Sequence, residues 1–214
     1  MAMITLLTDF DQSEYIGVMK GVILSTNPNA KIIDLTHNIS PQSITEASWL
    51  LKTNYKFFPK ATVFCCVVDP GVGTERKVLA IKTKDHYFLA PDNGLLYETL
   101  KEQEIVAKRH IPIPKNASKT FHGRDVFAQA AAKIDAGNYF EISREVKKIK
   151  KLELKENTIT RIDHFGNIIT NIKKKKKNKY KIKINDQTLT LNFYETYEKA
   201  PKNKLFLIEG SAKT

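Results

Sequence analysis

Three observations predict an α/β protein of two domains. At 214 residues, of which 42% are hydrophobic, the chain is long enough to bury a sizeable core. Strand and helix patterns alternate from the first residues, as in a Rossmann-like domain with a mostly parallel sheet. Near residue 145 the pattern changes to short alternating segments without an evident helix, which is typical of a small antiparallel β domain. We therefore expect an N-terminal α/β domain over residues 1–145 and a C-terminal β domain over residues 146–214.

The N-terminal pattern consists of short apolar runs separated by stretches in which apolar residues recur at helical spacing. Strands are predicted at Ile4–Thr8, Lys31–Leu35, Ala61–Val68, Val78–Thr83 and Tyr87–Ala90, and helices at Glu14–Ser25, Ser43–Asn54 and Arg124–Ala136. Ser13 is expected to cap the first helix, and Ser43 and Glu46 match a capping box at the start of the second. Gly137 and Asn138 are expected to end the third helix.

The C-terminal pattern alternates apolar and polar residues between turn signals. Strands are predicted at Asn157–Ile162, Ile168–Ile172, Tyr180–Ile184, Thr188–Leu191 and Leu205–Ile208. The charged stretch Ser143–Leu154 is expected to hold the boundary between the domains.

The formal charge of +12 is unevenly distributed, with thirteen lysines between Arg144 and Lys183. The run Lys173–Lys177 could bind the phosphates of a nucleic acid, or it could be a solvated surface of the lysine-rich kind found in heat-adapted proteins. We favour the solvated surface, because no aromatic residue interleaves with the run to stack on bases.

The two cysteines, Cys65 and Cys66, are neighbours on a predicted strand. Their side chains should point to opposite faces, which disfavours a disulfide between them. No stretch approaches the roughly 18 apolar residues of a membrane helix. A reducing cytoplasm is therefore the expected location, without membrane association.

Three carboxylates follow predicted strands, at Asp9, Asp69 and Asp92, and are expected to share the rim of the sheet where ligands bind. Asp69 lies in the stretch VVDPGVGTER, whose glycines begin like a dinucleotide-binding motif. Arg76 stands where the third glycine is needed, and the Lys-Ser/Thr of a P-loop is absent. The glycines instead permit a tight return of Arg76 toward Asp69, either to orient a water or as a structural ion pair.

The stretch FHGRD places His122 just before a predicted helix, with Gly123 leaving space beside it. His122 is a candidate site residue, or else an ordinary loop histidine next to an Asp125 that favours the helix dipole. For His37, which follows the second strand, we favour a structural role.

In the C-terminal domain, Asp163, Phe165 and Asn167 together offer a carboxylate, an aromatic face and an amide, a set that suits an ammonium group or a purine. Gly166-Asn167 is also a turn signal, and on the residues alone we favour the turn.

Seven stretches, in this order, carry a resemblance to a known family: ITLLTDF, YIGVMKGVI, IIDLTHNI, VVDPGVGTER, FLAPDNGLL, FHGRDVFAQAAA and IDHFGNIITNI. On them the chain resembles the S-adenosyl-L-methionine (SAM) hydroxide adenosyltransferases, or SAM hydrolases, whose fold is shared by the fluorinase and chlorinase. The resemblance implies a C-terminal antiparallel β-barrel and a homotrimer with SAM bound between subunits. It also implies a further strand and helix after Thr214, so we expect the barrel to be truncated here.

The resemblance implies that activated water attacks the ribose C5′ of SAM, giving adenosine and L-methionine, with no metal or other cofactor. The water would be held by Asp69, Arg76 and His122. The substrate-binding positions that it implies are Asp9 for the ribose hydroxyls, Asp163 and Asn167 for the methionine end, Phe165 as a pocket aromatic and Ser211 for the methionine carboxylate. Gly123 is also an implied substrate-binding position.

The fluorinase has tyrosine in place of Asp69 and His122 and serine in place of Gly123, so this chain resembles the water-using branch. Two alternatives stay open on the residues. One is a SAM-dependent halogenase that forms 5′-chloroadenosine. The other is a metal-dependent phosphoesterase with Asp9, Asp69, Asp92 and His122 as ligands.

Overall fold

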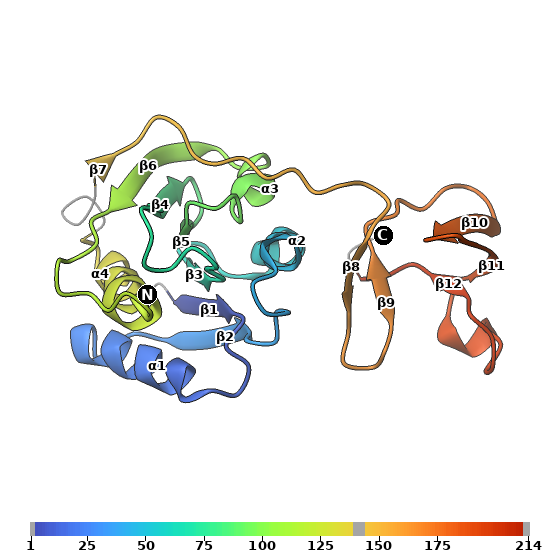
Figure 1. The fold of residues 1–214 in the computed structure, drawn as a ribbon, viewed down its shortest axis with the longest axis horizontal. Helices are drawn as coiled ribbons and strands as arrows, with labels where there is room; N and C mark the ends of the chain where they lie inside the picture. The colour runs from blue at the N-terminus through green and yellow to red at the C-terminus, as the bar shows by residue number, and fades with distance from the viewer. Residues whose placement is uncertain (1–2, 139–143, 212–214) are drawn as a thin grey trace. The chain divides into compact units, whose positions relative to one another are not determined.

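A computed structural model of the chain describes residues 3–138 and 144–211 (Figure 1). The chain divides into two compact units, Met1–Leu154 and Lys155–Thr214. The segment after residue 145 still packs on the first unit, because Val146 and Ile149 contact its core. Of the stretch expected to hold the domain boundary, Ser143 lies outside the described residues.

The first unit is built around a seven-stranded sheet in the order β2-β1-β3-β5-β4-β6-β7. Its strands are β1 (Ile4–Thr8), β2 (Ile32–Thr36), β3 (Val63–Val67), β4 (Val78–Thr83), β5 (Tyr87–Pro91), β6 (Ile105–Ile111) and β7 (Arg144–Glu145). Neighbours from β2 to β5 pair in parallel, whereas β4 pairs antiparallel with β5 and β6, and β7 antiparallel with β6. The prediction of an α/β fold with a mostly parallel central sheet is confirmed. β6 was missed because Lys108, Arg109 and His110 interrupt its apolar pattern.

Helices cover both faces of this sheet (Figure 1). They are α1 (Glu14–Thr26), α2 (Ile44–Asn54), η1 (Tyr55–Phe57), α3 (Tyr97–Leu100), η2 (Gly123–Ala128) and α4 (Gln129–Asp135). One core lies between the sheet and α1, η2 and α4, and the other between the sheet and α2, η1 and α3. Cys65 belongs to the first core and Cys66 to the second, and both are free thiols, as expected for neighbours on a strand.

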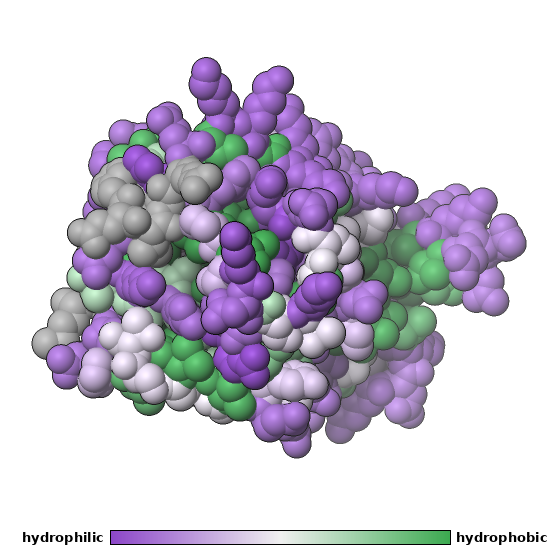
Figure 2. All heavy atoms as spheres, turned by 60° about the vertical axis from the view of Figure 1, so that its left-hand side comes forward, coloured by the Kyte–Doolittle hydropathy of each residue, from purple (hydrophilic) through white to green (hydrophobic). Residues whose placement is uncertain are grey.

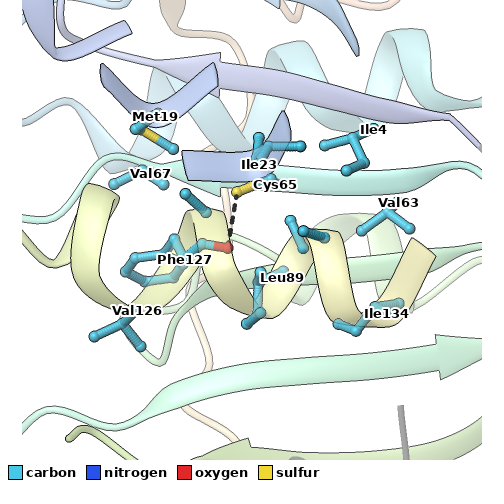
Figure 3. Packing of buried hydrophobic residues seen from close by; sticks show 14 of the residues in the cluster. Ile4, Met19, Ile23, Val63, Cys65, Val67, Leu89, Val126, Phe127 and Ile134 are labelled. Atoms are coloured by element: carbon cyan, nitrogen blue, oxygen red, sulfur yellow. Dashed lines mark hydrogen bonds between the residues drawn. The ribbon is translucent and has the colours of Figure 1, made fainter. Parts of the chain in front are cut away.

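Figure 3 shows the first core, in which the helix carrying Val126 and Phe127 packs on the strand that carries Cys65 and Val67. The Cys65 thiol lies 4.0 Å from the carbonyl oxygen of Phe127. Burial raises the pKa of Cys65 to about 12, so this thiol stays protonated and inert.

The helix predicted at Arg124–Ala136 starts one residue earlier and is not uniformly α-helical. Its first part, η2, is a π-helix, and α4 continues it. π-helical turns are rare and are frequently found at functional sites.

The helix caps differ in part from the sequence pattern. Ser43 accepts a hydrogen bond from the Glu46 N–H at 3.4 Å, as in a capping box, but Glu46 accepts from the N–H of Ser40 rather than from Ser43. Ser13 stands at the N-cap of α1 with an extended backbone but makes no side-chain cap bond.

The second unit contains two small sheets. β8 (Ile159–Ile162) and β9 (Ile168–Thr170) form an antiparallel hairpin. β10 (Lys179–Ile184) pairs antiparallel with β11 (Gln187–Tyr194), and β11 pairs in parallel with the short β12 (Leu207–Ile208). A 3-10 turn, η3 (Tyr197–Lys199), precedes β12. Among the described residues of this unit no sheet closes into a barrel.

Hydrophilic side chains cover most of the face shown in Figure 2, with smaller hydrophobic patches between them. Within the described ranges, no helix is both long enough and apolar enough to cross a bilayer.

The second core depends on an aromatic cluster centred on Phe64 of β3. This fully buried ring stacks on Phe88 of β5 at 5.2 Å between centroids and meets Phe58 edge-on at 5.3 Å. We expect Phe64→Ala to lower the free energy of unfolding by about 3–5 kcal/mol, because it leaves a cavity between neighbouring strands. Urea denaturation measures this loss. The matched control is Phe57→Ala, at a ring that is 72% exposed, and it should change stability by less than about 0.5 kcal/mol. Equal effects of the two substitutions would contradict this core assignment.

Candidate functional site

The site lies where the chain changes its direction of winding across the sheet. β1 pairs with β2 on one side and β3 on the other, and the helices that follow β1 and β2 pack on opposite faces. In open α/β sheets, ligands bind at such a switch point, outside the carboxyl ends of the strands. Asp9 follows β1 and Asp69 follows β3, so both residues lie at this rim of the sheet.

Two successive turns bring the loop after β3 back on itself. The Val72 N–H donates to the Asp69 carbonyl at 3.2 Å, and the Thr74 hydroxyl donates to the Gly71 carbonyl at 2.7 Å. Gly73 has φ +77°, and a Cβ there would lie 2.3 Å from the Lys119 carbonyl oxygen. Only glycine fits this conformation and this close approach. The predicted return of Arg76 to Asp69 is confirmed.

Asp69, Arg76 and His122 form one buried cluster. Arg76 Nε donates to both carboxylate oxygens of Asp69, at 3.0 Å and 2.9 Å, and Nη2 donates to Oδ2. Nη2 also lies 2.6 Å from Nδ1 of His122. The Asp69 and Arg76 side chains are only 7% and 9% exposed. Three residues from two separate loops therefore share one network.

Arg76 also determines the protonation of His122. A guanidinium carries only donors, so Nδ1 of His122 must accept this hydrogen bond. Burial lowers the pKa of His122, and the positive charge of Arg76 lowers it further. The imidazole is therefore neutral at pH 7, with its proton on Nε2.

The guanidinium retains one buried group without a partner. Arg76 Nη1 makes no hydrogen bond within the described part of the chain. The Phe127 ring, 5.8 Å from the guanidinium carbon, covers another side of the group. Leaving a buried charged donor unpaired costs more than about 1–3 kcal/mol, so Nη1 is suited to hold an oxygen of water or ligand.

Aromatic rings enclose the start of η2. Phe10, Tyr15 and Phe121 pack together with ring centroids 4.7–6.1 Å apart. A Cβ on Gly123 would lie 2.9 Å from the Phe121 ring and 3.1 Å from the Met19 sulfur. The space expected beside Gly123 is thus filled by protein atoms, and glycine is needed there for packing.

The loop before His122 is held by Asp125. This carboxylate accepts from the Ser118 N–H at 2.7 Å and pairs with the Arg124 guanidinium at 2.6 Å. Asp125 therefore fixes the loop, beyond any effect on the helix dipole.

Asp9 and Asp92 have different surroundings, although both end strands of the parallel sheet. Asp9 Oδ2 accepts from the Gln42 N–H at 2.8 Å. Asp92 Oδ1 instead accepts from the Lys150 N–H at 2.7 Å, and its Oδ2 lies 3.8 Å from His110 Nε2. Asp92 thus fastens the segment that follows β7. Across residues 3–138 and 144–211, no three His, Cys, Asp or Glu side chains gather as metal ligands would.

In the second unit, Asp163 is the centre of the turn between β8 and β9. Its Oδ1 accepts from the N–H groups of Phe165 and Asn167, and its Oδ2 accepts from the Asn167 amide, all at 2.9 Å. The predicted turn is therefore present, with Asp163 holding it. The Phe165 ring is 85% exposed at the tip, and Ser211 is exposed in a turn near the end of the described residues.

Asn93 supports the site, although it was not among the residues that the sequence singled out. Its amide donates to the Val68 carbonyl at 2.9 Å, and its Oδ1 accepts from the Leu95 N–H. The residue before Asp69 is thereby tied to the end of β5. The sequence signal was the Asn93-Gly94 pair, which indicates a turn. It does not reveal that the Asn93 amide binds the carbonyl of Val68, 25 residues earlier.

NMR titration of the histidine ring protons tests the network. We expect His122 to titrate below the ordinary histidine pKa of about 6.5, and its pKa to rise in Arg76→Met, which removes the neighbouring positive charge. Spectra of His122→Gln identify the signal. A wild-type value at or above 6.5, or no rise in Arg76→Met, would contradict the network described here.

Comparison with known proteins gives consistent matches over both units. The profile of the SAM hydroxide adenosyltransferase N-terminal domain matches residues 4–144, and that of the C-terminal domain matches residues 157–214. A Methanocaldococcus jannaschii protein named (R)-S-adenosyl-L-methionine hydrolase is 43% identical over 180 residues, which are 80% of this chain and 67% of that protein.

More distant matches agree with these. A fluorinase of an Actinoplanes species is 27% identical over 194 residues, covering 72% of this chain and 65% of that enzyme. The crystal structure of an uncharacterized conserved protein from Thermotoga maritima has a TM-score of 0.90 and 34% identity, covering 99% of this chain and 90% of that one. The two domain profiles and the 43% identity show that the chain belongs to the SAM hydroxide adenosyltransferase family.

Proposed function

We propose that this protein hydrolyses SAM to adenosine and L-methionine. The observation that carries the proposal is the buried Asp69–Arg76–His122 cluster, in which the guanidinium that binds the carboxylate and the imidazole keeps one nitrogen, Nη1, without a partner. Such a pair can bind one water, accept its proton and stabilise the negative charge that develops on its oxygen. The name of the Methanocaldococcus relative describes the same substrate and reaction type.

In the proposed step, the water oxygen bonds to the ribose C5′ while the C5′–sulfur bond breaks. The electron pair of that bond goes to sulfur, so the sulfonium becomes the neutral thioether of methionine. This leaving group needs no proton. The protein has to hold the nucleophile in line with the breaking bond and remove its proton.

Asp69 is the proposed proton acceptor. The neutral His122 has no free lone pair, because Nδ1 accepts from Arg76 and Nε2 carries the proton. A carboxylate can accept about four hydrogen bonds, more than Asp69 accepts from Arg76. Arg76 Nη1 would donate to the attacking oxygen, and His122 would hold the guanidinium in place.

Water is favoured over halide at this site. The Asp69 carboxylate would repel an anion, whereas it can accept a proton from water. A serine in place of Gly123, as in the fluorinase, would collide with the Phe121 ring unless that ring moved. The side chains around the start of η2 therefore leave room for the glycine of the hydrolases but not for the serine of the fluorinase.

Substrate binding is proposed to involve both units. Asp9 would accept hydrogen bonds from the ribose hydroxyls. Asn167 and Ser211 would bind the methionine end, and Phe165 would cover the ligand. The Asp163 carboxylate accepts three hydrogen bonds within its own turn and can accept one more, so it would bind the methionine end as well as hold Asn167 and Phe165 in place.

We further propose a homotrimer in which the second unit of one subunit, closed into a barrel, completes the site of the next. The exposed apolar side chains of the β8–β9 hairpin, Ile162 and Phe165 among them, favour burial against a partner. Light scattering should give three times the mass of the 24.4 kDa chain.

The chemistry proposed requires no bound cofactor, since the sulfonium supplies its own leaving group. The free thiols of Cys65 and Cys66 suit a reducing compartment, and we propose a cytoplasmic location on that basis.

Incubation with SAM, followed by chromatography, tests the reaction. We expect adenosine and L-methionine in equal amounts, unchanged by a strong chelator, and no 5′-chloroadenosine when chloride is present. Recovery of unreacted SAM alone, or chloride-dependent formation of 5′-chloroadenosine, would overturn the hydrolase proposal.

Asp69→Asn tests the proton acceptor. We expect kcat to fall by about 10²–10⁴-fold while SAM still binds, because the amide cannot take the proton of water. Asp92→Asn is the matched control: it changes the same residue type on the same rim, and its oxygen can still accept from the Lys150 N–H, so kcat should stay near that of the wild type. Near-normal turnover by Asp69→Asn would exclude Asp69 as the base.

A further inference from the structure

His37 contacts the loop that carries Asp9 at two points. Its Nδ1 lies 2.8 Å from the Thr8 hydroxyl, and its carbonyl oxygen accepts from the Asp11 N–H at 2.9 Å. Asp9 lies between these two anchors. Asp11 has φ +52°, a left-handed conformation that a non-glycine residue rarely adopts without support. His37, which lies in the connection from β2 to β3, thus holds the loop after β1 at Thr8 and at Asp11.

Both ring nitrogens of His37 face polar groups. Nε2 lies 3.1 Å from Asp34 Oδ1, and because a carboxylate oxygen only accepts, Nε2 carries a hydrogen that faces Asp34. Nδ1 is then the nitrogen that can accept from the Thr8 hydroxyl, whose oxygen accepts from the Phe10 N–H at 3.2 Å.

Asp34 is itself held as a carboxylate. Lys20 of α1 donates to its other oxygen at 2.6 Å. Burial raises the pKa of Asp34, but the bonds from Lys20 and His37 more than offset this and lower it overall. The ordered series Lys20, Asp34, His37 and Thr8 therefore connects the exposed side of α1 to the end of β1.

A bulge in the sheet gives His37 this place. Leu6 of β1 pairs with Asp34, but Leu7 pairs with Thr36, so β2 contains one extra residue, Leu35. Bulges of this kind redirect the chain next to functional sites. Thr8 is fully buried, so its hydroxyl needs the partner that His37 supplies.

We propose that His37 is a positioning residue for substrate binding: it fixes the loop from Thr8 to Asp11 so that the Asp9 carboxylate meets the ribose hydroxyls of SAM. The inference rests on the proposed role of Asp9. His37 does not act as a base, because its ring contacts Thr8 and Asp34 and not the Asp69 cluster. Its effect belongs to binding and not to the chemical step.

The first test separates KM from kcat. His37→Leu removes the acceptor for Thr8, and KM for SAM should rise roughly tenfold, the effect of losing one good hydrogen bond, with kcat within about twofold. His37→Asn can still accept from Thr8 and should recover most of the loss. His110→Asn, at a partly buried histidine of β6, should leave KM unchanged. Loss of kcat with KM unchanged in His37→Leu, or no recovery in His37→Asn, would overturn the proposal.

A double-mutant cycle tests whether His37 acts through Asp9. Once Asp9→Asn has removed the carboxylate, adding His37→Leu should raise KM only slightly further. Additive effects of the two substitutions would show that His37 acts elsewhere and would sink the idea.

The same variants are compared for binding of SAM and of adenosine by calorimetry. If the wild type binds adenosine but releases none from SAM, the hydrolase proposal fails. The ratio of the Kd of His37→Leu to the Kd of the wild type then still tests the role of His37. If wild-type turnover is normal and His37→Leu binds SAM as tightly as the wild type does, only the inference about His37 fails.

Discussion

The pairing of the Arg76 guanidinium with Asp69 and His122 is the interaction on which the site depends. A buried arginine is costly unless its charge is balanced and its N–H groups are hydrogen-bonded. Here the Asp69 carboxylate and the His122 Nδ1 bind every guanidinium nitrogen of Arg76 except Nη1. The same contacts keep the imidazole neutral, with its second nitrogen protonated. The remaining nitrogen, Nη1, has no partner among the described residues and is therefore available to a polar ligand. One set of contacts therefore balances the charge of Arg76 and leaves its Nη1 for a polar ligand.

The fold supports this arrangement with backbone conformations that few residues tolerate. Gly73 brings the Asp69–Arg76 loop against the Lys119 carbonyl. In the connection from β2 to α2, Gln42, with φ +63°, donates its N–H to Asp9. Strain of this type persists only where the surroundings hold it in place: the Asn93 amide holds the start of the first loop at Val68, and the Asp9 carboxylate holds the N–H of Gln42. Rigid strands and strained loops thus contribute separately to the site.

The candidate residues were predictable to different degrees. Asp69, Arg76 and His122 could be named because a carboxylate after a strand, a glycine-rich return and a histidine before a helix are local patterns. Their mutual contacts join residues 46 positions apart and could not be inferred from spacing. Asp92 shared the local pattern of Asp9, yet it binds the Lys150 N–H, because the segment after β7 crosses the end of β5. Asn93 and His37 gave only turn or loop signals, since their partners are backbone and hydroxyl groups that carry no pattern.

The sequence by itself determined the alternation of strands and helices, the separation of the two cysteines onto opposite faces and the return of Arg76 to Asp69. Each of these follows from side-chain periodicity or from backbone freedom within a few residues. Only the tertiary structure decided the position of β6 in the sheet, the π-helical start at Gly123, the direction of the hydrogen bond to His122 and the bulge that places His37. These depend on which strands become neighbours and which polar groups are buried together. Both are settled by packing between segments far apart in the chain.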